Sequence, residues 1–210
     1  MKVISIFFSL FFFITYGFSQ DTVIFVSGNK LAITTYYKDT TNNNTFIVKT
    51  LKGKYKSIHK EEIFSFVKSS GEENIVFEPF EDQNDEFTIE NMKIYIKGEQ
   101  AALTNSKTRL AFLSGFAIGM ASPILLSSIG ANYLLYAPVP IATTNFITGL
   151  TIPSEQSVLK KYPKQATNKF FMEGYRYTSK NKRLNSSIKG GLIGLGVGII
   201  SSIIISRISQ

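Results

Sequence analysis

The feature that most constrains this chain is a long stretch without a charged side chain, which runs from residue 110 to residue 154. A membrane-spanning helix needs about 20 apolar residues, so the stretch has room for two short crossings or one long, interrupted crossing. Pro123, Pro138 and Pro140 interrupt it, and prolines in membrane helices need neighbours that satisfy the freed backbone groups. We therefore expect a hydrophobic membrane region at residues 108–154, with two helical pieces, one of them short or re-entrant.

A second apolar segment lies near the C-terminus, where residues 187–206 contain ten Ile, Leu or Val residues and one charge, Lys189. At about 0.3–0.6 kcal/mol each, these residues favour insertion by roughly 3–6 kcal/mol before glycine and serine reduce the sum. The glycines fit neither the Walker loop nor the dinucleotide fingerprint, because the lysine of the first and the third glycine of the second are missing. The segment predicts a C-terminal transmembrane helix at residues 187–207.

Small residues recur every four positions along this helix and along part of the upstream region. Such a ridge lets another backbone approach closely, which is how membrane helices associate where water gives no driving force. We predict that the two ridges pack together as an intramolecular glycine zipper. A contact between copies of the chain is an alternative, as is no specific role, since glycine is common in membrane helices. The predicted helix-packing residues are Ala111, Gly115, Gly119, Gly190, Gly194, Gly198 and Ser202.

The N-terminus has the pattern of a secretory signal peptide. Lys2 precedes an apolar run of 13 residues, and small residues follow at Gly17 and Ser19, which favours cleavage after Ser19. An uncleaved signal anchor is the alternative. We expect residues 1–19 to be removed and the protein to reside in a cell-envelope membrane. The chain has no cysteine, which excludes a disulfide framework, a thiol nucleophile and a thiolate metal site.

Residues 20–80 contain five or six short runs of β-branched and aromatic residues, separated by turn signals such as Gly28-Asn29 and Gly53. So many short strands favour a small, strongly bent antiparallel barrel of the SH3-like kind. The predicted fold class is α+β: an SH3-like antiparallel β-barrel at residues 20–80, then an amphipathic helix and two to three membrane-embedded helices. The barrel is expected to lie in the periplasm.

Residues 81–107 combine an acidic hinge with the predicted amphipathic helix. Thr88 is a suitable N-cap, with Glu90 in the favourable first turn. Gly98 weakens a helix interior by about 1 kcal/mol, which indicates close packing at that point. We expect this helix to cover the barrel. Its apolar residues recur at helical spacing at Ile89, Met92, Tyr95 and Ile96.

Residues 155–186 carry eight Lys or Arg residues and predict a basic loop that contacts anionic lipid headgroups. If the region at 108–154 crosses once, this loop lies in the cytoplasm and obeys the positive-inside rule; if it crosses twice, the loop lies on the barrel's side and violates the rule. Length favours two crossings and charge favours one, and we give charge slightly more weight. The predicted headgroup contacts are Lys180, Lys182, Arg183 and Lys189.

The aromatic residues of the same segment allow a second interpretation. Phe170, Phe171, Tyr175 and Tyr177 are interspersed with the basic residues, a combination that can bind RNA by stacking on bases. Export makes nucleic-acid binding the weaker hypothesis.

Catalytic chemistry has little support in the sequence. His59 is the single histidine, beside Glu61 and Glu62; an acid–base pair there is conceivable, but a surface corner is the more common environment. The acidic run at 81–86 lacks the spacing of a calcium loop, and no G-x-S-x-G elbow occurs. We predict no catalytic residue, no cofactor and no metal.

Two short patterns resemble a family of exported membrane proteins in Bacteroidota. The first pattern comprises Phe87, Thr88, Met92, Tyr95, Ile96, Gly98, Glu99, Gln100 and Ala102, and the second comprises Phe171, Gly174 and Tyr175. Such proteins have a small N-terminal β unit, this helix and glycine-rich hydrophobic segments. Asn91 departs from the pattern, since a second acid is expected there. The resemblance implies architecture and location only.

The sequence therefore predicts a non-enzymatic membrane-anchored scaffold or accessory subunit, whose exported β domain binds a partner protein. The alternative is an oligomerising glycine-zipper component linked to transport or pore formation. In either case membrane lipids are expected partners and nucleic acid is not.

Overall fold

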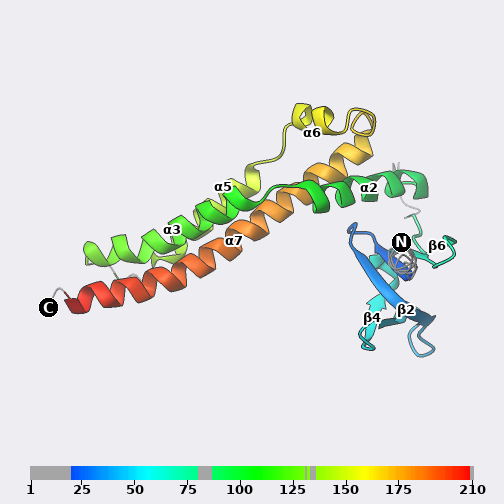
Figure 1. Ribbon diagram of the computed structural model, residues 1–210, viewed down its shortest axis with the longest axis horizontal. Helices are drawn as coiled ribbons and strands as arrows, with labels where there is room; N and C mark the ends of the chain where they lie inside the picture. Colours follow the sequence, from blue (N-terminus) through cyan, green and yellow to red (C-terminus); the bar gives the residue numbers. More distant parts are fainter. Residues whose placement is uncertain (1–19, 80–86, 131, 133–135, 209–210) are drawn as a thin grey trace, which may run out of the picture. The chain divides into compact units, whose positions relative to one another are not determined.

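The computed structural model describes residues 20–79, 87–130, 132 and 136–208, and the chain divides into two compact units, residues 1–81 and 82–210. Figure 1 shows the strands of the first unit and the helices of the second. The predicted signal peptide and most of the acidic hinge lie outside the described residues. The architecture is α+β, as predicted.

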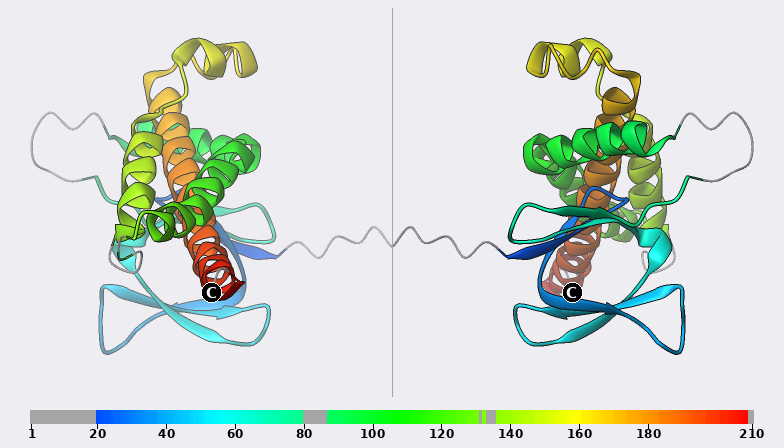
Figure 2. Two further views of the ribbon diagram at one scale, coloured as in Figure 1. Left: turned by 90° about the vertical axis from the view of Figure 1, so that its left-hand side faces the viewer. Right: turned by 90° about the vertical axis from the view of Figure 1, so that its right-hand side faces the viewer.

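The first unit is one antiparallel sheet with the strand order β4-β3-β2-β1-β5-β6 (Figure 2). Its strands are β1 (Asp21–Phe25), β2 (Lys30–Lys38), β3 (Thr45–Thr50), β4 (Tyr55–His59), β5 (Ile63–Val67) and β6 (Glu73–Ile75), and the short 3₁₀ turn η2 (Lys60–Glu62) joins β4 to β5. In the described part of the chain, β4 and β6 are the two edges and do not pair with each other. The predicted closed barrel is therefore corrected to an open sheet.

The open sheet bends around its own core. The rings of Tyr36 on β2 and Phe66 on β5 stack with centroids 3.8 Å apart, although β1 separates their strands. In the described residues β6 pairs with β5 and does not reach β4, so the sheet stays open. The buried core consists of Val23, Ile33, Val48, Ile58, Ile63 and Phe66.

The second unit is helical. It comprises α2 (Ile89–Asn105), α3 (Arg109–Ser128), α5 (Pro138–Leu150), α6 (Glu155–Lys161) and α7 (Lys169–Ile208). Helix α7 is 40 residues long; α2 packs along its first half and α3 along its second half (Figure 1).

The predicted start of α2 is confirmed. The Thr88 hydroxyl oxygen accepts a hydrogen bond of 3.2 Å from the Asn91 amide, which satisfies one of the free donors in the first turn. The buried face of this helix packs against α7 around Gly98, and the expectation that the helix also covers the sheet stays a prediction.

The prediction that residues 155–186 form a loop is wrong about their secondary structure. This segment contains α6 and the first half of α7, so the predicted helix at 187–207 is the end of a longer helix. The cause is the spacing of Phe171, Met172 and Tyr175, which places three large side chains on the buried face of α7. Their burial supports helix in spite of the surrounding charges.

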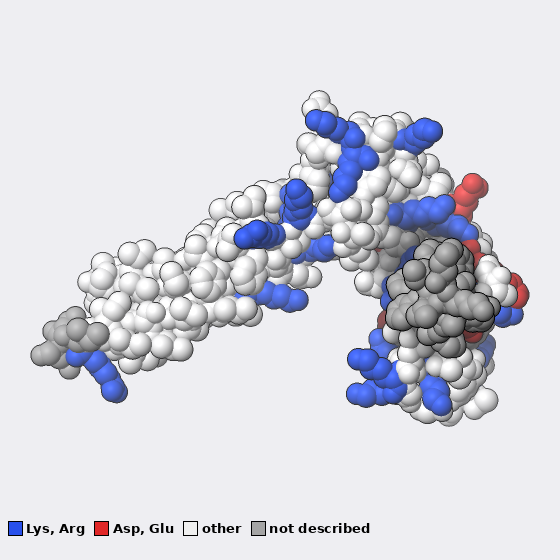
Figure 3. All heavy atoms as spheres, in the orientation of Figure 1, with Lys and Arg blue, Asp and Glu red and all other residues white. Residues whose placement is uncertain are grey.

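Two helices in the described residues are long and apolar enough to cross a membrane: α3, and α7 from Lys169 to Ile205. Helix α5 has 13 residues, so the region at 108–154 does form two helical pieces, the second of them short. Figure 3 shows an extended charge-free surface over this part of the helical unit.

Helices α3 and α7 run in the same direction. Gly115 lies against Ser187 and Gly191, and four residues later Gly119 lies against Gly191 and Leu195. The chain must therefore return between the end of α3 and the start of α7, and α5, which packs on both helices, lies on this return path.

Candidate functional site

The α3–α7 interface is a contact between two backbones. A Cβ atom added to Gly115 would overlap the carbonyl oxygen of Ser187, and one added to Gly194 would overlap that of Phe116. Added to Gly198, a Cβ would lie 3.0 Å from the ring of Pro123. No side chain fits at these positions without moving one helix away from the other.

The structure brings most of the predicted packing residues together. Ser202 is buried and donates a hydrogen bond of 2.9 Å to the Gly198 carbonyl of its own helix, while Ala111 is half-buried at the start of α3. Five of the predicted residues line the interface directly: Gly115, Gly119, Gly190, Gly194 and Gly198.

Sequence reasoning missed Gly191, which is buried where three helices meet. An added Cβ there would lie 2.7 Å from a methyl group of Ile141 on α5, so this glycine lets α5 approach α7. The spacing of four residues singled out one ridge, and Gly191 lies one position outside it.

The α2–α7 interface has the same close approach. A Cβ added to Gly98 would overlap the carbonyl oxygen of Phe171 and lie 3.0 Å from the Tyr175 amide nitrogen. Reciprocally, Gly174 lies against the carbonyl of Tyr95. The two halves of α7 are therefore both joined to their neighbours through glycine.

Next to Gly98, the Glu99 side chain is enclosed in this interface and is 2% exposed. The Thr178 hydroxyl donates a hydrogen bond of 3.0 Å to its Oε1 atom, whereas Oε2 has no partner among the described residues. Burial raises the pKa of Glu99 to about 7, and the Thr178 hydrogen bond opposes this shift. A carboxyl that is buried without a cation favours its neutral form.

A second titratable group lies one turn earlier on α2. Burial, together with the charges of Glu99, Tyr177 and Glu173, raises the pKa of Tyr95 to about 12. The α2–α7 interface is therefore a place where added negative charge is costly.

The predicted headgroup residues have different environments. The Lys182 ammonium donates to the carbonyl oxygens of Ala102 and Leu103, so it satisfies the end of α2. Lys189 is exposed, and Lys180 and Arg183 are half-buried.

Two of the aromatic side chains considered for RNA binding are buried and cannot stack on bases. Phe171 and Tyr175 are buried, with their rings 5.5 and 5.6 Å from that of Tyr162, while Tyr177 is exposed. His59 is exposed at the end of β4, and Glu61 lies in η2.

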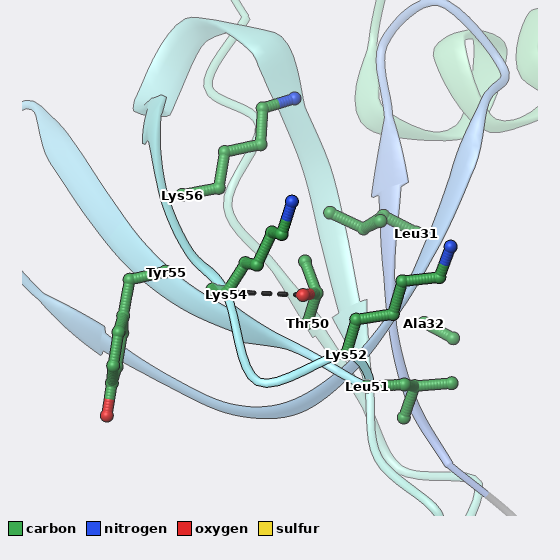
Figure 4. Close-up of a pocket in the computed structure, with 8 residues that line it drawn as sticks. All are labelled: Leu31, Ala32, Thr50, Leu51, Lys52, Lys54, Tyr55 and Lys56. Atoms are coloured by element: carbon green, nitrogen blue, oxygen red, sulfur yellow. Dashed lines mark hydrogen bonds between the residues drawn. The ribbon is translucent and has the colours of Figure 1, made fainter.

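The β unit carries a depression of about 540 Å³ beside the turn between β3 and β4. Leu31 and Ala32 of β2 form part of its lining, and Lys52, Lys54 and Lys56 surround it. Figure 4 shows the three lysine side chains extending to one side of the hairpin, with Leu31 between them and Tyr55 pointing away. We call this site the lysine-rimmed depression.

Within the described residues, no group of three or more His, Cys, Asp or Glu side chains is placed to hold a metal ion. Known protein families, curated proteins and solved structures provide no match to the chain. The resemblance to exported membrane proteins in Bacteroidota therefore stays a prediction, and the function must be argued from the structure itself.

Proposed function

We propose that the protein is a non-enzymatic, membrane-anchored component of the cell envelope. In this proposal α3 and the second half of α7 cross the bilayer together, and the exported β unit is available to a partner protein. The observation that carries the proposal is the exposure of the apolar helices.

The most apolar windows of α3 and α7 are only 22% and 28% buried within the structure. The core helix of a water-soluble protein buries most of its apolar side chains, because each exposed one forfeits about 1.5–3 kcal/mol. Contiguous apolar surface on this scale marks a contact with a membrane or a partner. The outward-facing large residues are Leu110, Leu113, Leu125, Ile129, Leu192, Ile193, Val197, Ile200, Ile203, Ile204 and Ile205.

The direction of the helices supports two crossings before α7. If α3 and α7 both span the bilayer in parallel, the residues between them must return to the first side. A single crossing of the region at 108–154 would make the two helices antiparallel, which disagrees with the packing of Gly115 and Gly119. The basic residues of α6 and early α7 then lie on the side of α2 and the β unit, against the positive-inside tendency.

Cysteine labelling tests this arrangement, because the natural chain contains no cysteine. In intact cells and opened vesicles, a membrane-impermeant maleimide should label Asn43→Cys and Lys164→Cys from the same side. Asn132→Cys and a cysteine added after Gln210 should be labelled only from the other side. Labelling of all four positions from one side would contradict the proposal, and separation of Asn43 from Lys164 would contradict the two-crossing arrangement.

The alternative, an oligomer assembled through glycine ridges, has less support. The ridge of α7 is already occupied by α3 within one chain. A second copy would have to use other surfaces.

Site-specific photocrosslinking in native membranes separates the two hypotheses. A photoreactive residue at Tyr37, which is 50% exposed on β2, should give an adduct with a different envelope protein. The matched position Ile193, which is 54% exposed on α7, should crosslink mainly to lipid. A ladder of self-adducts from Ile193, with none from Tyr37, would instead favour the oligomerising component.

A further inference from the structure

We propose that the lysine-rimmed depression of the β unit is a second membrane-contact site, which docks on an anionic lipid surface. This inference rests on the proposed membrane anchoring and adds to it: the β unit would be held against the bilayer through the β3–β4 hairpin.

Positive charge is concentrated on the β3–β4 hairpin. Between residues 40 and 60 the chain has five lysines and no carboxylate. Its next acids, Glu61 and Glu62, follow in η2. Lysines that surround the depression have no ion pair in the described part of the chain, whereas Lys60 and Lys68 are paired with Glu78 and Glu72. The hairpin therefore presents uncompensated positive charge.

The hairpin combines this charge with exposed apolar surface. Leu51, in the turn, is 51% exposed and Tyr55 is 63% exposed. An apolar side chain and an aromatic ring with a polar end are the groups that enter the headgroup region of a bilayer. Lysines next to them bind anionic headgroups while their aliphatic stems cover apolar surface.

Backbone hydrogen bonds fix the shape of the hairpin. The Thr50 carbonyl oxygen accepts a hydrogen bond of 2.9 Å from the Gly53 amide. The Thr50 amide donates a hydrogen bond of 2.9 Å to the Lys54 carbonyl oxygen. Gly53 has a φ of 76°, which a residue with a side chain adopts only with strain. Because Lys52, Lys54 and Lys56 alternate along this fixed hairpin, their side chains extend to one side (Figure 4).

The chain is long enough for the contact. Helix α2 has 17 residues and ends near Lys182, so its start lies about 25 Å from the level where α3 begins. From Pro79 to Thr88 the chain can extend over about 30 Å. A membrane surface within reach of a tethered unit is present at high effective concentration.

The test uses the full chain in vesicles of phosphatidylcholine alone or with one quarter phosphatidylglycerol. The fluorescence emission of an environment-sensitive dye attached to Leu51→Cys should shift to shorter wavelength only in the anionic vesicles. Spin-labelled lipid should quench this fluorescence in the same vesicles only. The control position Asn43→Cys lies in the loop at the other end of β3 and should not respond.

Replacing Lys52, Lys54 and Lys56 with glutamine should lower the ratio of docked to free hairpin about a hundredfold, at about fivefold for each lysine. The matched control replaces Lys30 and Lys38 and should leave the ratio within twofold. A response that does not need anionic lipid, or that survives the triple replacement, would overturn the proposal. A response only to an acidic protein segment would likewise overturn it in favour of a protein ligand.

An alkaline carbonate wash of the same vesicles separates this inference from the proposed function. If the chain resists the wash and the dye does not respond, the hairpin contact is wrong and the anchoring stands. If the wash releases the chain, the proposed anchoring itself fails.

Discussion

Replacing Gly194 with leucine is expected to separate α3 from α7 and to destabilise the protein by at least 3 kcal/mol, because even a Cβ atom at this position overlaps the Phe116 carbonyl oxygen. Overpacking a close-packed interior costs about 1–3 kcal/mol when side chains can move aside. Here the obstacle is backbone, so the whole helix must shift. Unfolding of the purified chain by a denaturing detergent, followed by circular dichroism, measures the loss.

The same helix provides the matched control. Gly196 is two residues away, is exposed, and has no atom within 4 Å of an added Cβ. Gly196→Leu should be neutral or slightly stabilising, since leucine is a better helix former than glycine by up to about 1 kcal/mol. Equal stability of the two leucine variants would show that the α3–α7 contact does not form as described.

The second large effect is a fall in the free energy of unfolding as the pH rises toward the pKa of Glu99. Burial raises the pKa of this carboxyl from 4.5 to about 7, so the folded protein binds the proton more tightly than the unfolded chain does. Its destabilising contribution is absent below about pH 4.5, grows between about pH 4.5 and 7, and is constant above. A shift of this size corresponds to roughly 3 kcal/mol.

Glu99→Gln should remove this part of the pH dependence, because an amide does not titrate. The glutamine carbonyl can still accept from Thr178, but its NH₂ group replaces an oxygen that has no partner. An unsatisfied buried amide costs about 1–3 kcal/mol, so the flattened profile is the decisive observable rather than the absolute stability. Free energies of unfolding between pH 4 and pH 8 measure it.

Glu90→Gln is the control for this experiment, since Glu90 is exposed in the first turn of the same helix. Its pH profile should keep the slope of the natural protein between about pH 4.5 and 7. If Glu99→Gln has the same slope as the natural chain, the Glu99 carboxyl is not enclosed as the structure places it.

Local signals were sufficient for several parts of this fold. The cap at Thr88 and the spacing of Gly115, Gly119, Gly190 and Gly194 depend on residues that are near one another in the chain. Such patterns determine where a helix begins and which stripe of it allows close contact. They do not determine whether the partner helix packs parallel or antiparallel, because a ridge of small residues allows close approach in either orientation.

The parts that could not be predicted depend on distant contacts. Whether the sheet closes is decided by its two edge strands, β4 and β6, whose sequences carry no local signal for or against pairing with each other. Helix at 169–186 depends on burial of Phe171 and Tyr175 by other elements, while the lysines around them favoured a loop. Nothing local in the sequence marks Glu99 as buried, since carboxylates are mostly exposed, and the close approach of α7 at Gly98 encloses it.

The parallel packing of α3 and α7 has a consequence for biogenesis. Gly115 and Gly119 meet their partners only after residues 187–195 of α7 have been synthesised. If the chain is inserted into a membrane as proposed, α3 must wait with its groove empty until then, and the short α5 lacks its α7 neighbour. Under the proposed anchoring, premature termination before Gly190 would thus leave α3 and α5 without α7, and proteases that clear incomplete membrane proteins should recognise such a product.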